Sequence, residues 1–389
     1  MGLNTVTAME YCNFVTDGTH DSPKATDNGY KLITSKHLKR YDIDFNSAKY
    51  ISEEDYRKVI ERSSIEQWDI LFSMIGTIGN TYIETNDNIN YACKNMGIFK
   101  LGGDEMKSKW LYYYLQSPKA IEYIVASSRG TTQGYVPLGA LRKMPVDVVE
   151  DKKRNEIVSF LWNLDEKIKN NIAINNNLEQ QAKALYKDWF FDFSPFSSNG
   201  NLPDGWRFGL VGDIIQLHDS KRVPLSGAER DKMAKVYPYY GATSLMDYVD
   251  NYLFDGIYLL LGEDGSVIDK KGFPILQYVE GKFWVNNHAH IITGKNGFSV
   301  EQLYLLFSLT NVQSIVTGAV QPKISQTNLK KLPVIIPSEK DLKKFDVIVQ
   351  PIFAQIRNLR AENNKLSVIR DSLLPKLMSD EIDVSNINL

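Results

Sequence analysis

The chain has 389 residues, of which 43% are hydrophobic and 24% are charged, and this composition predicts a folded protein of two or three domains. Its two cysteines form no CxxC pair, no apolar run approaches the ~18 residues of a membrane span, and the N-terminus lacks a signal-peptide pattern. We therefore expect a cytoplasmic protein without membrane contact. The net charge of −2 is less basic than is usual for nucleic-acid binders, so DNA binding would depend on local charge or on a partner.

Residues 1–149 predict a first globular domain of mixed α and β structure. The runs KLITS and DILFSMIG are typical of strands, and glycine, proline, asparagine and aspartate separate the runs as turns. A short helix is predicted over 108–118, SKWLYYYLQSP. Two polar loops, DGTHDSPK (17–24) and SRGTTQGY (128–135), are rich in side chains that can form hydrogen bonds.

Residues 150–192 predict one long helix. From Ile157 to Trp189, mostly apolar residues recur at alternating spacings of four and three, which is the a/d seam of a coiled coil, and no glycine interrupts the stretch. Such a helix would be a rod of roughly 58 Å at 1.5 Å per residue. A single exposed helix of this length with one apolar stripe needs a partner to be stable.

The second half of the chain, with a domain at 193–337 and a helix at 338–389, repeats the first. An offset of 188 aligns GTTQGYVPLGALRKMPV (130–146) with GAVQPKISQTNLKKLPV (318–334) and continues without a gap through the helices. A weaker similarity, at an offset of about 202, aligns VTAMEYCNFVTDG with FGLVGDIIQLHDS near the two domain starts. The halves are thus expected to start alike, diverge in the middle, where YLLLG and FWVNNHAHIIT predict strands, and end alike.

The repeat predicts an α+β fold in which two similar domains are separated by two long antiparallel coiled-coil helices with pseudo-twofold symmetry. Each helix finds its simplest partner in the other copy. Asn175 and Asn363 occupy equivalent seam positions, where a polar residue costs stability but fixes register. Pro351 predicts a kink or a delayed start of the second helix. The alternative is that each helix packs only on its own domain.

Catalytic motifs are missing from the sequence. We find no phosphate loop, no HExxH, no GxSxG, no dinucleotide fingerprint and no Asn-Pro-Pro-aromatic motif. The segment GEDGSV (262–267) lacks a lysine and carries two acids, so it predicts a turn rather than a phosphate site. His288 and His290 lie two residues apart on one face of a predicted strand, and without a third ligand nearby they predict no metal site.

The polar loops instead carry the residue types that read DNA. Arginine and lysine can contact guanine, asparagine and glutamine can contact adenine, and hydroxyl groups and backbone amides suit phosphates. For each residue the alternative is an ordinary solvated loop. The candidate DNA-binding residues are Thr19, His20, Lys24, Arg129, Thr132, Gln133, Lys221, Arg222, Tyr239, Tyr240, Asn287, His288, Gln321 and Lys323.

Several short segments, in this order, resemble a known family. They are DGTHDSP in the first half, PYYGA, YLLLGEDGS and VNNHAHI in the second, and the repeated Lys-x-Pro-Val followed by a long helix that closes with LEQQAKALYKDWF. Together they resemble the specificity subunit of type I restriction–modification enzymes over essentially the whole chain. Pro351 departs from an uninterrupted second helix.

The resemblance implies a protein without catalytic activity of its own. It would hold two target-recognition domains apart on two antiparallel helices, recognise a bipartite double-stranded DNA sequence, and recruit methyltransferase subunits and, through them, a restriction subunit. S-adenosylmethionine, ATP and magnesium would then be held by those partners, and no cofactor by this chain. We expect Glu179, Lys183 and Lys187 to face solvent as candidate contacts to the methyltransferase.

Two other classes of function remain as alternatives. A coiled-coil scaffold whose globular domains bind proteins or glycans would use tyrosine-rich loops such as YPYYGA equally well. An unrecognised nuclease or methyltransferase is disfavoured because its motifs are missing. Methylation of a split, adenine-containing DNA motif separates the first hypothesis from both.

Overall fold

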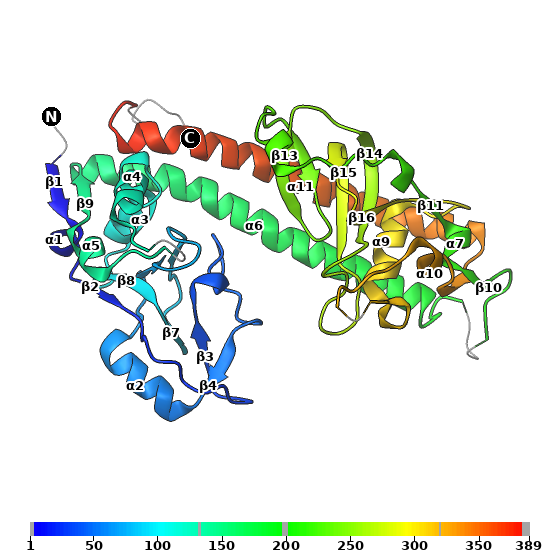
Figure 1. Ribbon diagram of the computed structural model, residues 1–389, viewed down its shortest axis with the longest axis horizontal. Helices are drawn as coiled ribbons and strands as arrows, with labels where there is room; N and C mark the ends of the chain where they lie inside the picture. The colour runs from blue at the N-terminus through cyan, green and yellow to red at the C-terminus, as the bar shows by residue number, and fades with distance from the viewer. Residues whose placement is uncertain (1–3, 131–133, 197–200, 319, 383–389) are drawn as a thin grey trace. The chain divides into compact units, whose positions relative to one another are not determined.

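The computed structural model describes residues 4–130, 134–196, 201–318 and 320–382, and Figure 1 traces its elements along the chain. The chain divides into two compact units: unit 1 comprises Met1–Asn171 and Ala361–Leu389, and unit 2 comprises Ile172–Arg360. Each unit therefore contains one globular domain and one part of each long helix. None of the helices in these ranges is long and apolar enough to cross a membrane.

The domain of unit 1 combines small sheets with short helices. One sheet has the strand order β2-β8-β5-β6, a second has the order β4-β3-β7, and β1 pairs with β9. The strands are β1 (Asn4–Thr7), β2 (Phe14–Asp17), β3 (Tyr30–Ile33), β4 (Lys49–Ile51), β5 (Ile70–Ser73), β6 (Thr81–Ile83), β7 (Tyr91–Cys93), β8 (Met96–Lys100) and β9 (Pro145–Val148). The helices are α1 (Ala8–Tyr11), α2 (Glu53–Ser63), α3 (Glu105–Tyr114), α4 (Pro118–Ser127) and α5 (Leu138–Lys143).

Local sequence determines where the helices of unit 1 begin and end. Ser52 caps α2 by accepting a hydrogen bond from the Asp55 amide, at 3.1 Å. α3 ends at Tyr114, and Ser117 caps α4, which begins at Pro118, a residue that suits the first turn of a helix but not its interior. The prediction of a single helix over 108–118 is therefore wrong, because the segment contains the end of one helix and the start of another.

The domain of unit 2 is built on a single larger sheet with the strand order β11-β16-β14-β15-β12-β13, and β10 pairs with β17 outside it. The strands are β10 (Arg207–Leu210), β11 (Ile215–Leu217), β12 (Tyr237–Tyr240), β13 (Leu245–Val249), β14 (Phe254–Gly262), β15 (Leu276–Val285), β16 (Ala289–Gly294) and β17 (Pro333–Ile336). The helices are α7 (Val211–Ile214), α8 (Gly227–Arg230), α9 (Val300–Leu309) and α10 (Gln326–Lys330). The run FWVNNHAHIIT, predicted as strand, is split between β15 and β16.

The two domains repeat each other at their edges. The ribbon β1·β9 of unit 1 corresponds to β10·β17 of unit 2, and a short helix follows the first strand of each ribbon. The Ala8 amide donates to Met144 O at 2.7 Å, and the Val211 amide donates to Leu332 O at 2.8 Å. Ala8 thus corresponds to Val211 at an offset of 203, and Met144 corresponds to Leu332 at an offset of 188. The offset at the start of the domains is therefore one residue larger than the predicted value of about 202.

The middle of the two domains is also repeated, although the sequence suggested divergence there. In unit 1, β3 pairs parallel to β7 and antiparallel to β4. In unit 2, β12 pairs parallel to β15 and antiparallel to β13. The difference is that the 10-residue strand β15 joins both parts of the sheet in unit 2, whereas unit 1 uses the separate short strands β6 and β7. The connections differ in length and sequence, which hides a shared topology.

The two long helices are α6 (Asp151–Phe190) and α11 (Glu339–Met378), with 40 residues each. Within unit 1, Asp165 of α6 contacts Arg370 of α11, and Asn171 contacts Asn363. From the first contact to the second, the residue number rises from 165 to 171 on α6 and falls from 370 to 363 on α11. The two helices are therefore antiparallel, as predicted. Packing of each helix on its own domain alone, the alternative, is therefore wrong.

The same pairing continues in unit 2, where the aromatic end of α6 meets the start of α11. The rings of Tyr186 and Trp189 lie 5.5 and 5.4 Å from the ring of Phe345. α11 begins 12 positions before Pro351 and continues through it, so the predicted delay of this helix is wrong. Pro351 and Val347, whose carbonyl has lost its usual donor, both lie on the exposed side of the helix, where water can replace the missing hydrogen bond.

Of the two asparagines Asn171 and Asn175 on α6, Asn171 is the one that forms hydrogen bonds across the helix pair. Asn171 Nδ2 donates to Glu362 Oε2 at 2.7 Å and to Asn363 Oδ1 at 2.9 Å. The antiparallel register places Leu359 opposite Asn175, and Asn175 Oδ1 is buried without a hydrogen-bond partner among the described residues. The prediction of equivalent register roles for Asn175 and Asn363 is corrected accordingly, because sequence equivalence at an offset of 188 does not make two positions spatial partners.

Candidate nucleic-acid interface

A pair of bridged residues recurs at the same place in each repeat, and we call it the repeat bridge. In unit 1, Arg129 and Tyr135 exchange two backbone hydrogen bonds of 2.8 Å. In unit 2, Thr317 and Lys323 exchange hydrogen bonds of 2.9 and 2.7 Å. The positions match at an offset of 188, so one backbone element presents Arg and Tyr in one domain and Thr and Lys in the other.

Each repeat bridge is held against a loop at the end of a central strand. The Val136 amide donates to Met74 O at 2.9 Å in unit 1, and the Ile324 amide donates to Glu263 O at 2.8 Å in unit 2. The loops turn at Gly76 and Gly265, whose φ angles of 79° and 83° strongly favour glycine. GEDGSV is thus a turn that positions the second repeat bridge, as its sequence indicated.

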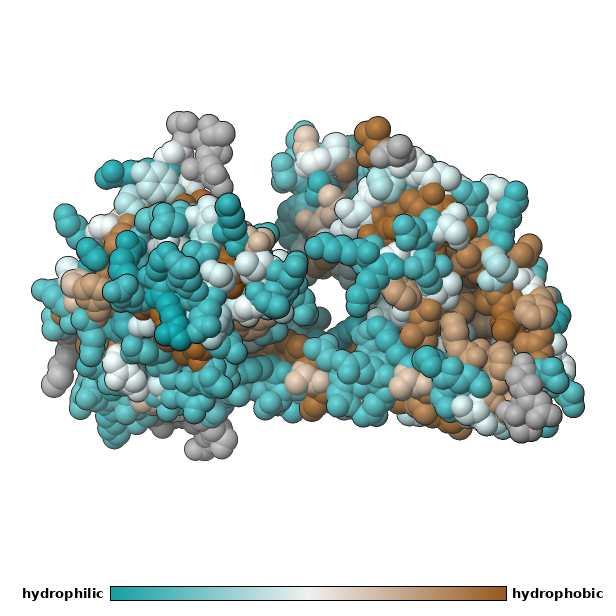
Figure 2. All heavy atoms as spheres, turned by 90° about the horizontal axis from the view of Figure 1, so that it is seen from below, coloured by the Kyte–Doolittle hydropathy of each residue, from teal (hydrophilic) through white to brown (hydrophobic). Residues whose placement is uncertain are grey.

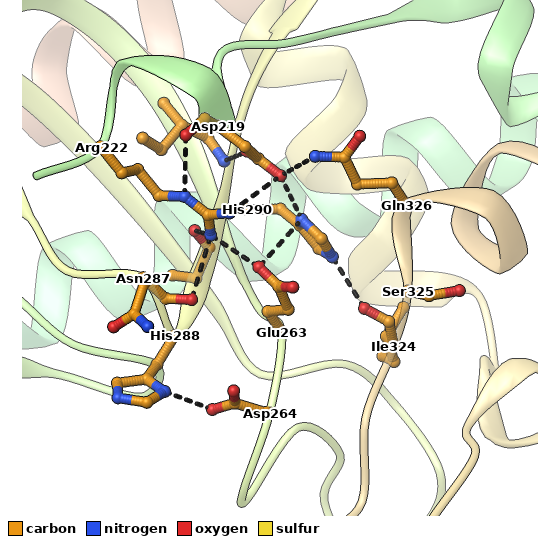
Figure 3. A network of polar contacts seen from close by, with 12 residues as sticks. Asp219, Arg222, Glu263, Asp264, Asn287, His288, His290, Ile324, Ser325 and Gln326 are labelled. Atoms are coloured by element: carbon orange, nitrogen blue, oxygen red, sulfur yellow. Dashed lines mark hydrogen bonds and ion pairs between the residues drawn. The ribbon is translucent and has the colours of Figure 1, made fainter. Parts of the chain in front are cut away.

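In unit 2 this loop belongs to a network of buried charges, shown in Figure 3. Arg222 Nη1 donates to Glu263 Oε2 at 2.6 Å and to Ala289 O at 2.9 Å. His290, which is fully buried, directs Nδ1 at Asp219 Oδ2 (2.6 Å) and Nε2 at a backbone carbonyl oxygen, that of Ile324 (2.8 Å). Both ring nitrogens of His290 are therefore occupied by partners within the protein.

The network stabilises its carboxylates in the ionised form. Burial alone raises the pKa of Asp219, but hydrogen bonds from His290 and the Ile291 amide, with the charge of Arg222, outweigh it and the net pKa is lowered. Burial also raises the pKa of Glu263, but the hydrogen bond from Arg222 and the charge of His290 outweigh burial, and the net pKa is again lowered. The hydrogen bonds and positive charges of the network thus favour the ionised form of both carboxylates, Asp219 and Glu263.

The same network includes a group of side chains that could in their geometry bind a metal ion. Asp219, Glu263 and His290 have potential ligand atoms within 4.8 Å of one another, so the structure supplies neighbours to His290 that the sequence did not indicate. Arg222 already donates to Glu263, and both ring nitrogens of His290 already have hydrogen-bond partners within the protein. His288 turns to a different partner, with its Nδ1 2.5 Å from Asp264 Oδ1, so the two histidines do not act together.

Of the candidate DNA-binding residues of unit 2, Tyr239 is buried and Arg222 is mostly covered by its neighbours. Arg222, with a side chain only 14% exposed, has its donors committed to the charge network. Tyr239 is 1% exposed, and its hydroxyl meets the backbone of Leu225, so it supports a loop from inside. Neither side chain is available to DNA. Sequence reasoning missed this because burial depends on β15 and β16, which lie far along the chain.

The other candidates in unit 2 lie at or near the surface. Lys221, Asn287 and Gln321 are exposed, and Tyr240 is half-buried against the ring of Phe283. Lys323 is 48% exposed and lies 3.3 Å from Glu263 Oε1, so it carries a positive charge on the second repeat bridge.

In unit 1 the candidates lie on the loop after β2 and on the first repeat bridge. His20, Lys24 and Arg129 are exposed, and Thr19 is half-buried. His20 Nε2 lies 2.9 Å from Asp17 Oδ2, which fixes the ring beside the end of the strand. Thr132 and Gln133 lie outside the described residues.

Sequence reasoning missed Arg62, a cation beside the same loop. Arg62 Nη2 donates to Asp17 Oδ1 at 2.7 Å, yet its side chain remains 60% exposed. It lies in the last turn of the helix α2, whereas the predicted DNA contacts lie in polar loops. Asp17 and Asp219 are matched by the offset of 202, and each is a buried carboxylate that binds one arginine and one histidine. The match between Asp17 and Asp219 in the sequence could therefore have indicated that an arginine lies beside Asp17, as Arg222 lies beside Asp219.

The helix residues expected to face solvent differ in their surroundings. Glu179 and Lys183 are both half-buried, so the expectation of solvent exposure is wrong for both. Glu179 Oε1 accepts hydrogen bonds from the Tyr304 hydroxyl at 2.5 Å and from Lys183 at 2.7 Å. Lys187 is exposed and pairs with Asp192 at 2.6 Å.

Unit 2 also exposes apolar surface. A groove of about 300 Å³ is lined by Tyr186, Phe190, Phe191, Phe208, Leu306, Thr310, Pro333, Val334 and Ile335. Figure 2 shows one face of the molecule, on which more hydrophobic surface gathers on unit 2, at the right, than on unit 1.

Comparisons with known proteins agree on one family. A family model described as the type I restriction modification DNA specificity domain matches residues 24–180 and 203–368, once in each half. The specificity subunit of the type I restriction enzyme MjaIX of Methanocaldococcus jannaschii is 26% identical over 91% of this chain and 87% of its own length. The corresponding subunit of HindI from Haemophilus influenzae is 22% identical over 82% of this chain and 88% of its own length.

A solved structure supports the same fold. The crystal structure of the type I restriction–modification S subunit from M. genitalium superposes with a TM-score of 0.54 at 17% identity, covering 97% of this chain and 96% of that one. Specificity subunits are non-catalytic DNA-recognition components of their enzymes. With two matched domains and two antiparallel helices, this chain belongs to the family of type I restriction–modification specificity subunits.

Proposed function

We propose that this chain reads a bipartite double-stranded DNA sequence, with one domain for each half-site, and recruits methyltransferase subunits and, through them, a restriction subunit. The observation that carries the proposal is the repeat bridge. The same backbone element, fixed to the same kind of loop, presents Arg129 and Tyr135 in one unit but Thr317 and Lys323 in the other. A constant scaffold with different polar side chains is what two different half-sites require.

Recruitment of partners explains how a chain with a net charge of −2 can act on DNA. Phosphate contacts supply most of the salt-dependent affinity of DNA-binding proteins, and the methyltransferase subunits would add them. S-adenosylmethionine, with ATP and magnesium for restriction, belongs on those partner subunits in this proposal. We therefore expect weak DNA binding by the isolated chain, and nanomolar affinity at physiological salt would contradict that expectation.

The primary test is the pattern of DNA methylation in cells with and without the gene. We expect a split, adenine-containing motif to lose methylation when the gene is deleted. Long-read sequencing measures this directly, and restoring the gene is the control. An unchanged methylation pattern would refute the proposal and would favour the scaffold alternative.

A second test separates the two domains. Replacing residues 1–149 with those of another family member should change one half of the methylated motif and leave the other half unaltered. If both halves changed together, the assignment of one domain to each half-site would be wrong.

Single substitutions refine the assignment. Arg129→Ala and Lys323→Ala should each weaken recognition at one half-site, by about 1–3 kcal/mol if the side chain contacts a base. Competition between duplexes altered in one half-site measures this. A loss that is uniform across sequences would instead indicate a phosphate contact.

A further inference from the structure

The two long helices are copies of one another, so each could in principle pair with a second copy of itself. At the offset of 188, buried apolar positions of α6 match buried apolar positions of α11, as Ile157 matches Phe345 and Ile168 matches Ile356. If the α6 helices of two chains paired antiparallel, apolar residues would again meet apolar residues. Hydrophobic burial therefore does not by itself select the pairing within one chain.

One buried layer of the helix pair in unit 1 is ionic. Asp165 Oδ1 lies 2.6 Å from Arg370 Nη1, and the two side chains are only 6% and 3% exposed. Tyr113 donates its hydroxyl to Asp165 Oδ2 at 2.8 Å, and Tyr41 donates to Oδ1 at 2.8 Å. The carboxylate is thus satisfied from both the partner helix and the globular domain.

The equivalent layer of unit 2 is apolar. The offset of 188 matches Asp165 with Phe353 and matches Arg370 with Ala182. Phe353 is 1% exposed and Ala182 is fully buried, and both belong to the hydrophobic core of unit 2. The repeat is therefore broken, in charge but not in burial, at both of these positions.

The broken repeat discriminates between helix partners. If α6 paired with a second α6, Ala182 would take the place of Arg370, and the buried Asp165 would lose its counter-charge. If α11 paired with a second α11, Phe353 would take the place of Asp165, and Arg370 would be buried unpaired. A buried charge without its partner is strongly destabilising.

We propose that the Asp165–Arg370 pair selects α6·α11 pairing and excludes α6·α6 and α11·α11 pairing with a second copy. Each helix pair then joins one α6 to one α11, the two helices that follow different domains. This proposal rests on the repeat and the buried ion pair, and it holds whatever ligand the domains bind.

The asparagine layer does not discriminate in this way, which makes it a matched control. Asn171 meets Asn363 within the chain, and Asn175 is the repeat equivalent of Asn363. In an α6·α6 pair, Asn171 would therefore meet Asn175, which has the same side chain. In an α11·α11 pair, Asn363 would meet Leu359, as Asn175 faces Leu359 within the chain, so the kinds of contact stay the same in number. Asn171→Leu should lower stability without changing the choice of partner.

The test uses the full chain in two differently tagged forms that are unfolded together in denaturant and refolded by dilution. Asp165→Phe with Arg370→Ala gives unit 1 the residues that unit 2 already packs at the equivalent positions, so the two pairings become equivalent at this layer. Capture on one tag, followed by native mass spectrometry, counts dimers that carry both tags. We expect the double variant to form at least about tenfold more mixed dimers than the wild type.

The Asn171→Leu variant should form mixed dimers at the wild-type level. That level includes any dimers in which α6 of one chain pairs with α11 of the other. Asp165→Asn with Arg370→Gln keeps hydrogen-bonding groups but removes both charges, and we expect an intermediate level. If the Asp165→Phe, Arg370→Ala variant does not unfold cooperatively, the Asp165→Asn, Arg370→Gln variant tests the proposal in its place. The proposal is overturned if both charge-free variants form no more mixed dimers than the wild type, or if Asn171→Leu raises them equally.

Discussion

Replacing Arg222 by alanine tests whether this residue supports the second domain or contacts DNA. The guanidinium is 14% exposed and pairs at 2.6 Å with Glu263, whose side chain is 13% exposed. Removing one partner of a buried ion pair costs about 3–5 kcal/mol. In a unit of this size each kcal/mol lowers the melting temperature by about 2–4 °C, so we expect a decrease of roughly 6–20 °C. Calorimetric unfolding of the full chain, without DNA, measures this.

Lys323→Ala is the matched control, because Lys323 contacts the same carboxylate from an exposed position at 3.3 Å. An exposed pair contributes about 0–1 kcal/mol, so its loss should hardly change the melting temperature. The reasoning fails if Arg222→Ala melts within about 2 °C of the wild type. It also fails if Arg222→Ala and Lys323→Ala affect unfolding equally.

Three further predictions follow from buried polar groups. Asn175→Leu should stabilise the chain by roughly 1 kcal/mol in denaturant unfolding, because it removes an unsatisfied buried oxygen opposite Leu359; a destabilised variant would disprove this register. The lowered pKa values of Asp219 and Glu263 stabilise the fold above the ordinary carboxylate pKa, and this contribution should disappear as pH falls below about 4. Denaturant unfolding from pH 3 to 7 should show a smaller loss for Asp219→Asn, and an equal loss would be evidence against the network. Burial raises the pKa of the Cys93 thiol to about 12, so iodoacetamide at pH 8 should label Cys93 only after unfolding, and rapid labelling of folded protein would contradict this.

The sequence alone determined the features that depend on periodicity. The spacing of apolar residues located both long helices, because one buried stripe on a helix imposes a local repeat of three and four residues. The offset of 188 established that the halves are copies, and an antiparallel pairing followed from having a domain between the helices. The polar loops also predicted Arg129 and Lys323 as DNA contacts, and the structure shows both side chains to be exposed.

Only the tertiary structure decided which polar groups meet. Asp165 lies beside the predicted seam, and its importance appears only when Arg370 and Tyr113 approach it from distant parts of the chain. Arg222 has the composition of a DNA contact, but strands far along the chain bury it in a charge network. Burial and counter-charge arise from long-range packing, which no local pattern encodes, and they determine whether a charged side chain holds the fold together or remains free for a ligand.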